Sequence, residues 1–112
     1  MMIWIDEAVP SGPFRLVVCA SSDAGLYVLI EGPPPQEQPG DDGPDYFELT
    51  AQTTTGERLD FQRFSRTGGK TSSTYLGQFA APDTPERLRL RLAAGDRELF
   101  EATAIPVHFE PA

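Results

Sequence analysis

The sequence predicts an all-β protein, and three observations carry this prediction. Short apolar runs rich in β-branched residues recur along the 112-residue chain, and residues 87–92 (RLRLRL) alternate strictly. Glycine and proline number 10 and 11, which favours many turns. No stretch carries a 3.6-residue amphipathic pattern with helix caps. The predicted fold is an antiparallel β-sandwich of seven or eight strands, immunoglobulin-like in outline, with a small β-barrel as the alternative.

The expected strands follow one another at the spacings of a turn-rich β domain. We place them at residues 2–5, 14–20, 26–30, 46–53, 59–64, 71–81, 87–92 and 97–109. The cluster SSDAG at residues 21–25 joins the second and third strands into a hairpin. Phe64 interrupts the alternation of its strand and predicts a bulge. Pro106 has no backbone N–H and therefore requires an edge position or a bulge.

The last hairpin can be given a register from its charges. A two-residue turn at residues 94–95 sets Arg91 opposite Glu98, and a bulge farther out sets Arg89 opposite Glu101. Opposite charges facing each other across neighbouring strands are a favourable arrangement. We therefore expect these arginines to have a structural role in ion pairs.

The chain length fits one β domain spanning residues 1–112. Residues 32–45 are rich in proline, glycine and acidic side chains and have no periodic apolar pattern. Such a composition cannot bury enough apolar surface to order itself. We expect a flexible loop there.

Charge and cysteine content limit the partners and the compartment. The net charge is −8, with −9 in residues 1–57 and +1 in residues 58–112. Because an acidic chain is repelled by phosphate backbones, nucleic acid is not expected as a partner. Cys19 is the single cysteine, and neither a signal peptide nor a membrane span is apparent, so we expect a cytoplasmic protein. Eight arginines against one lysine indicate a bacterial, GC-rich source.

No motif points to catalysis, a cofactor or a metal ion. The stretch TGGKTSS (residues 67–73) has the look of a phosphate loop, but Phe64 stands where that motif requires glycine. His108 is the only histidine and cannot form a histidine-based metal site alone. Cys19 lies inside an apolar run and is expected to be a buried, inert thiol. The sequence therefore predicts a protein that is not an enzyme.

Two surfaces are candidates for binding. Arg63, Arg66 and Lys70 form a local basic cluster beside two glycines, and guanidinium groups with backbone amides suit an anion or an acidic partner. The alternative is an ordinary solvated loop.

The hairpin of residues 14–30 is apolar on both faces, although one face of an antiparallel sheet usually meets water. A loop or a second subunit is expected to cover its outer face. The candidate interface residues are Val17, Cys19, Tyr27 and Leu29.

The runs FELTAQTTTGERLDF, TYLGQFA and RLRLRL, within residues 46–92, resemble small bacterial β proteins of a domain-of-unknown-function family. The resemblance rests on strand and turn pattern and implies no activity.

Three functions are compatible with these features. The leading hypothesis is a non-catalytic module for protein binding or assembly, with a protein partner or a second copy in a homodimer. The second is a small-ligand domain that binds an anion at the arginines or a sugar on outward aromatic residues. The third is an acidic inhibitor or immunity-type protein that covers a basic partner.

Overall fold

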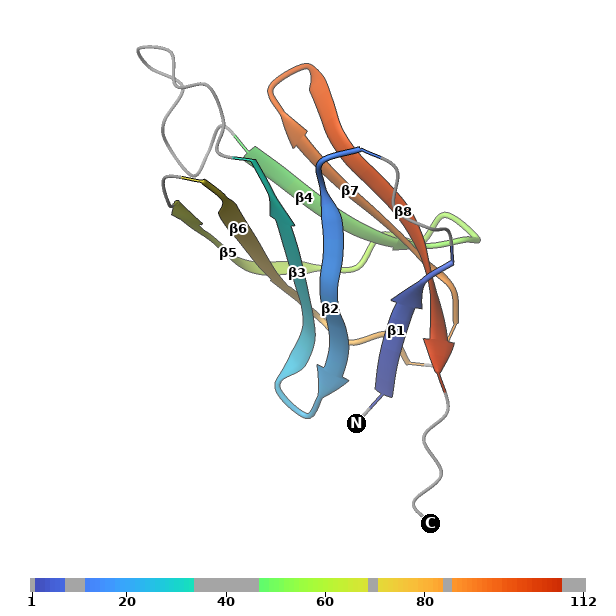
Figure 1. Ribbon diagram of the computed structural model, residues 1–112. Coiled ribbons are helices and arrows are strands. Elements are labelled where there is room, and N and C mark those ends of the chain that lie inside the picture. The colour runs from blue at the N-terminus through green and yellow to red at the C-terminus, as the bar shows by residue number, and fades with distance from the viewer. Residues whose placement is uncertain (1, 8–11, 34–46, 69–70, 84–85, 108–112) are drawn as a thin grey trace.

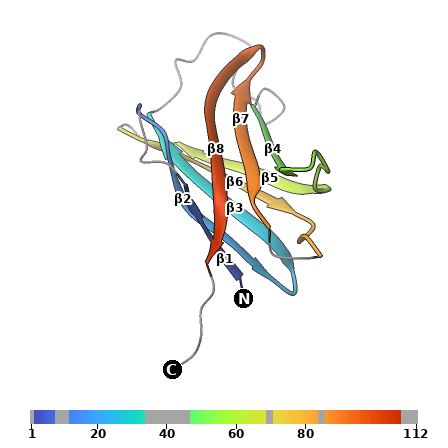
Figure 2. The same cartoon turned by 90° about the vertical axis from the view of Figure 1, so that its right-hand side faces the viewer.

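The computed structural model describes residues 2–7, 12–33, 47–68, 71–83 and 86–107. These residues form one antiparallel sheet of eight strands in the order β4-β7-β8-β1-β2-β3-β6-β5. The sheet curls on itself into a nearly closed barrel (Figures 1 and 2). The strands are β1 (Met2–Asp6), β2 (Arg15–Ser22), β3 (Gly25–Gly32), β4 (Phe47–Thr53), β5 (Phe61–Gly68), β6 (Ser73–Phe79), β7 (Leu88–Ala94) and β8 (Arg97–Val107).

The all-β, antiparallel prediction is confirmed, and the described residues contain no helix. The sheet does not show an immunoglobulin-like sandwich, whereas the alternative of a small barrel fits it. Each strand is hydrogen-bonded to the next around the curl, and only β4 and β5 have a single neighbour. Of the loop expected at residues 32–45, Gly32 ends β3 and residues 34–45 lie outside the described residues. The described part of the chain has no helix that is both long and apolar enough for a membrane crossing.

The core lies on the concave side of the sheet. Side chains of a strand alternate between its two faces, so every second residue points inward. In β3 the inward residues are Leu26, Val28 and Ile30, and all three are completely buried. The three leucines of RLRLRL in β7 are buried in the same way. Burial of each such side chain stabilises the fold by about 1.5–3 kcal/mol.

Glycines shape the turns of two hairpins, β2–β3 and β7–β8. The β2–β3 hairpin is confirmed, with Ser22 paired to Gly25 across a two-residue turn. Gly25 has a φ of 135°, and a Cβ there would lie 2.6 Å from the carbonyl oxygen of Phe79. Gly95 has a φ of 59° and is the first central residue of the β7–β8 turn. Only glycine accepts these conformations at low cost.

The register predicted for the β7–β8 hairpin is wrong by a small shift. The turn consists of residues 95–96, and a bulge follows it, so Arg91 lies opposite Glu101 instead of Glu98. The expected ion pairs nevertheless form between diagonal neighbours. Arg91 Nε lies 3.5 Å from a Glu98 oxygen, and Arg89 Nε lies 3.8 Å from a Glu101 oxygen. Long arginine side chains reach diagonal partners on one sheet face, which explains why the pairs tolerate the shift.

Besides the bulge in the β7–β8 hairpin, two further bulges interrupt the described strand pairing. The bulge predicted at Phe64 lies slightly earlier in β5, between Phe61 and Arg63. A second, unexpected bulge lies at Val17 in β2. A bulge adds one unpaired residue and exchanges the faces of the residues beyond it.

Pro106 occupies a position where β8 has only one neighbouring strand. It lies opposite Trp4 of β1, beyond the last β7–β8 pair at Ala104, so β8 has only one neighbour there. This agrees with the edge position expected for proline. Trp4 is buried, and its Nε1–H donates to the carbonyl oxygen of Glu86 at 2.7 Å. That bond fastens the segment before β7 to the end of the barrel.

Candidate functional site

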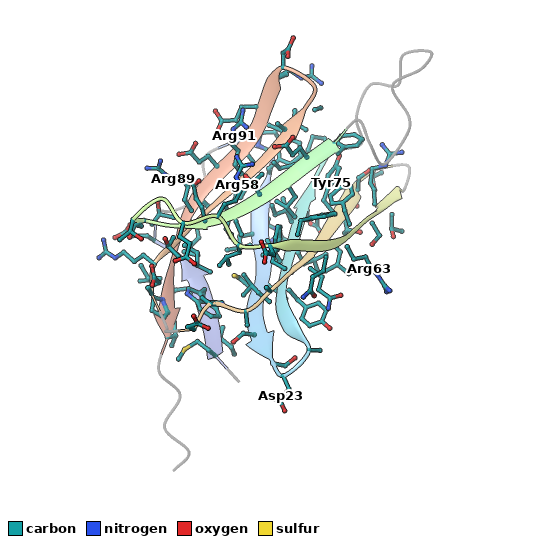
Figure 3. All side chains as sticks on the ribbon, turned by 180° about the vertical axis from the view of Figure 1, so that it is seen from behind. Asp23, Arg58, Arg63, Tyr75, Arg89 and Arg91 are labelled. Atoms are coloured by element: carbon teal, nitrogen blue, oxygen red, sulfur yellow. The ribbon has the colours of Figure 1, made fainter. Side chains whose placement is uncertain are left out.

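The end strands β4 and β5 meet along an incompletely closed boundary, which we call the seam. At one end of the seam the connecting segment, residues 58–60, bridges the two sides. The N–H of Leu59 donates to the carbonyl oxygen of Ala51 at 2.9 Å, and the N–H of Ala80 donates to that of Asp60 at 2.8 Å. From this segment β4 and β5 diverge, as Figure 3 shows. The barrel is therefore closed near the β4–β5 connection and open beyond it.

A cavity of about 710 Å³ lies at the open part of the seam. Its volume is within the range of about 300–1,000 Å³ that is usual for ligand pockets. Four phenylalanines from β4, β5 and β6 dominate its walls. The lining residues are Phe47, Glu48, Leu49, Thr50, Arg58, Leu59, Asp60, Phe61, Phe64 and Phe79.

Phe61 is the most exposed aromatic wall of the cavity. Its side chain is 58% exposed although it is paired with Phe79, whose side chain is buried. The two rings meet edge to face with centroids 5.9 Å apart. A large exposed aromatic ring held against a buried one is a preformed apolar contact surface.

An aromatic cluster supports the other end of the cavity. The ring of Tyr75 is buried among three phenylalanines, with centroid distances of 6.3 Å to Phe14, 5.3 Å to Phe47 and 6.5 Å to Phe64. The guanidinium of Arg66 lies 5.2 Å from the ring centroid of Phe47, in a cation–π contact. These contacts fix the position of Phe47, which also lines the cavity.

Two hydroxyl groups are buried beside this cluster. Neither the Tyr75 hydroxyl nor the Ser73 hydroxyl has a hydrogen-bond partner of good geometry within the described part of the chain. Burial raises the pKa of the Tyr75 phenol above its ordinary value, against the opposing effects of the Arg66 charge and the Ser73 hydroxyl. The phenol is therefore neutral at physiological pH.

The rim of the cavity carries charged side chains of both signs. Glu48, Arg58 and Asp60 are exposed, and none of the three forms an ion pair with another described residue. No group of His, Cys, Asp and Glu suited to a metal ion occurs among the residues that the structure describes. The site thus combines an apolar interior with a rim that carries exposed charges of both signs.

The basic cluster predicted at Arg63, Arg66 and Lys70 is not assembled on one face. Arg63 lies opposite Gln78 on the outer face of the sheet, whereas Arg66 lies opposite the buried Tyr75 on the inner face. Residues three apart in a strand point to opposite sides. The expected strand ended at residue 64 and left Arg66 in a loop, but β5 continues to Gly68. Lys70 lies outside the described residues.

The predicted interface residues divide between the two faces of the sheet. Val17 is 44% exposed, and Tyr27 and Leu29 are half-buried on the outer face of β3. Cys19 is completely buried in the core, as expected for an inert thiol, and so does not belong to that face. The bulge at Val17 accounts for the division, because it reverses the alternation along β2 and brings Val18 outward in place of its neighbour.

The outer surface of the sheet is apolar over β1, β2, β3 and β6. Val18, Leu29 and Leu76 are paired in register across three neighbouring strands. Ile3 is paired with Ala20 of β2 and continues this surface toward β1. We call this the outer apolar face; its large members are Ile3, Ile5, Val17, Val18, Tyr27, Leu29 and Leu76.

The opposite half of the outer surface is charged. Arg89 with Glu101 and Arg91 with Glu98 form ion pairs between β7 and β8, and Arg87, just before β7, pairs with Glu7, just after β1. One continuous sheet therefore presents two different surfaces to solvent. Ile5, Val18 and Leu76 were not identified as surface candidates from the sequence. The only pattern that could have identified them is that each stands next to a residue that is buried in the structure.

Comparison with known proteins finds no relative: no protein family, curated protein or solved structure matches this chain. The resemblance of residues 46–92 to a domain-of-unknown-function family stays a prediction.

Proposed function

We propose that this protein is a non-catalytic assembly module, in which the outer apolar face binds the same face of a second copy. The observation that carries the proposal is the row of Val18, Leu29 and Leu76 on three adjacent strands. The side chains of Val18 and Leu76 are 44% and 37% exposed. Contiguous apolar surface of this kind is uncommon on proteins that act alone.

The distribution of charge favours a second copy as the occupant. Two chains of net charge −8 repel each other, so they can meet closely only where acidic side chains are absent or neutralised. In the described part of the outer apolar face the one carboxylate beside the row belongs to Glu31, and Arg15 neutralises it at 2.9 Å. A central patch without charges, bordered by polar groups, is the usual composition of a dimer interface.

A dimer with two-fold symmetry buries the outer apolar face of both copies. In an isologous dimer the same patch serves both partners, so the outer surface of a sheet can pack on its own copy. Two sheets packed in this way lie about 10 Å apart with interdigitating side chains. The apolar residues on both sides of the β2–β3 hairpin then have a common explanation: one side fills the barrel and the other fills the dimer interface.

Light scattering coupled to size-exclusion chromatography tests the proposal. The wild-type protein is expected to elute as a dimer, and Leu76→Lys is expected to elute as a monomer because it places two cations in the interface. Gln52→Lys, on the outward side of β4, adds the same charge away from the outer apolar face and should leave the dimer intact. A wild-type protein that stays monomeric at high concentration would contradict the proposal.

A second candidate function, ligand binding, is favoured by the cavity at the seam. It is a separate site on a different pair of strands, and it does not require the outer apolar face. The backbone geometry of β4 indicates which class of ligand this cavity accepts.

A further inference from the structure

We propose that the seam accepts an extended peptide segment of a partner protein, which adds to the free edge of β4 and inserts alternate apolar side chains into the cavity. This site is independent of the proposed dimer.

The free edge of β4 presents backbone hydrogen-bonding groups to the seam. The carbonyl oxygen of Ala51 points there, because it accepts from Leu59. Backbone groups two residues apart in a strand point to the same edge, so the N–H and C=O of Leu49 also face the seam. The alternate residues Glu48 and Thr50 direct theirs toward β7. A strand such as β4, which has only one neighbour in the sheet, is a template for strand addition.

The chain itself shows how a strand docks on this edge. Arg58 forms an antiparallel bridge with Gln52, and Leu59 donates to Ala51 while its side chain is buried. After Asp60 the chain pairs with β6, where Phe61 lies opposite Phe79, and no residue of β5 forms a bridge with β4. Beside Leu49, where the cavity begins, the described part of the chain therefore forms no further strand pair with this edge of β4.

An incoming segment that continues this register has a defined pattern. Its inward side chains are those opposite Leu49, on the same face as Leu59, and they enter a cavity walled by Phe61 and Phe64. The same residues carry the N–H groups that face β4, as Leu59 does. The occupant is thus apolar at every second position.

Charge complementarity determines which residues are expected at the intervening positions of the incoming segment. These residues point outward beside the exposed carboxylate of Glu48, which has no ion pair with a described residue. The chain as a whole carries −8. Basic residues at these positions pair across strands with Glu48 and are attracted by the net charge. The predicted ligand is an extended segment of alternating basic and apolar residues.

A blocked, fluorescein-labelled heptapeptide of alternating lysine and leucine with a central phenylalanine tests this in anisotropy titrations. We expect saturable binding, weakened about tenfold or more by Phe61→Ala, which removes an exposed wall of the cavity. Leu76→Ala, an exposed apolar truncation on the outer apolar face, is the matched control and should leave the peptide affinity unchanged. A peptide of identical composition without alternation should bind at least about tenfold more weakly.

Peptides with N-methyl groups examine the strand addition itself. Methylation at the apolar positions removes the donors that face β4 and should abolish binding. Equal binding of the methylated peptide, equal binding of the unalternated peptide, or an affinity indifferent to Phe61→Ala would each overturn the proposal. Repeating the titration on Leu76→Lys separates the two sites, because failure of the dimer leaves the expected peptide binding in place.

Discussion

Leu49 of β4 packs directly against Gly77 of β6, across the interior of the barrel. A Cβ atom added to Gly77 would lie 2.5 Å from Cδ2 of Leu49 and 3.0 Å from Cε2 of Phe79. Strands β4 and β6 are not neighbours in the sheet, so this contact forms only because the sheet curls back on itself. The absence of a side chain at Gly77 therefore sets how closely β4 approaches β6, and with it the depth of the seam.

The first prediction concerns Gly77→Ala. The added methyl group forces Leu49 or β4 to move, and overpacking of a core costs about 1–3 kcal/mol. We expect a loss of that size in the free energy of urea unfolding. Gly68→Ala, on the neighbouring strand, is the control because its nearest contact would be Ser73 Oγ at an ordinary 3.7 Å. Equal stability of the two variants would show that the barrel does not close through the Leu49–Gly77 contact.

The second prediction concerns the thiol of Cys19. Burial raises its pKa from 9.0 to about 12. The thiolate is therefore suppressed in the folded protein, and iodoacetamide at about pH 8 should alkylate Cys19 only in denaturant. Rapid alkylation of the native protein would show that the centre of the barrel opens readily.

The same shift links stability to pH. Because the folded pKa lies above the unfolded value, the folded state holds the proton more tightly. This contribution is complete below pH 9 and is lost as the pH rises toward 12. The stability advantage of the wild type over Cys19→Ala should therefore shrink between about pH 8 and pH 10.5, as urea titrations at both values would measure. A difference in unfolding free energy that stays constant between these pH values would contradict the conclusion that burial raises the pKa of Cys19.

The strands were predictable because one face of each is buried. RLRLRL and the inward leucine, valine and isoleucine of β3 have a period of two, and this period survives in the structure. The choice between sandwich and barrel was not predictable. It depends on how far one sheet curls, and that depends on contacts such as Leu49 with Gly77, which lie far apart in the sequence.

The candidate sites were harder to predict from the sequence than the strands, for two physical reasons. A single bulge at Val17 exchanges the faces of β2, so Val18 points outward and Cys19, which was also a candidate interface residue, lies in the core. The seam exists only where the two end strands of the sheet come together, and no local pattern in β4 or β5 identifies an end strand. Phe61 is consequently exposed even though it has the residue type and phase of a core position.

The third prediction concerns the hydroxyl of Tyr75. It is buried without a hydrogen-bond partner of good geometry among the described residues, while the ring contacts Phe14, Phe47 and Phe64. A buried hydroxyl that loses its bonds to water costs free energy, whereas its removal keeps the ring contacts. Tyr75→Phe should therefore leave the unfolding free energy unchanged or raise it by up to about 1 kcal/mol.

A variant that removes the ring at the same position separates the two contributions. Tyr75→Ala deletes the aromatic contacts and should cost about 3–5 kcal/mol, as for other large aromatic truncations in a core. Both variants can be followed by urea unfolding through Trp4, whose side chain is buried on another strand. A loss of more than about 1 kcal/mol in Tyr75→Phe would mean that the hydroxyl makes a stabilising bond in solution. The polar group beneath the seam would then be part of the structural support of Phe47.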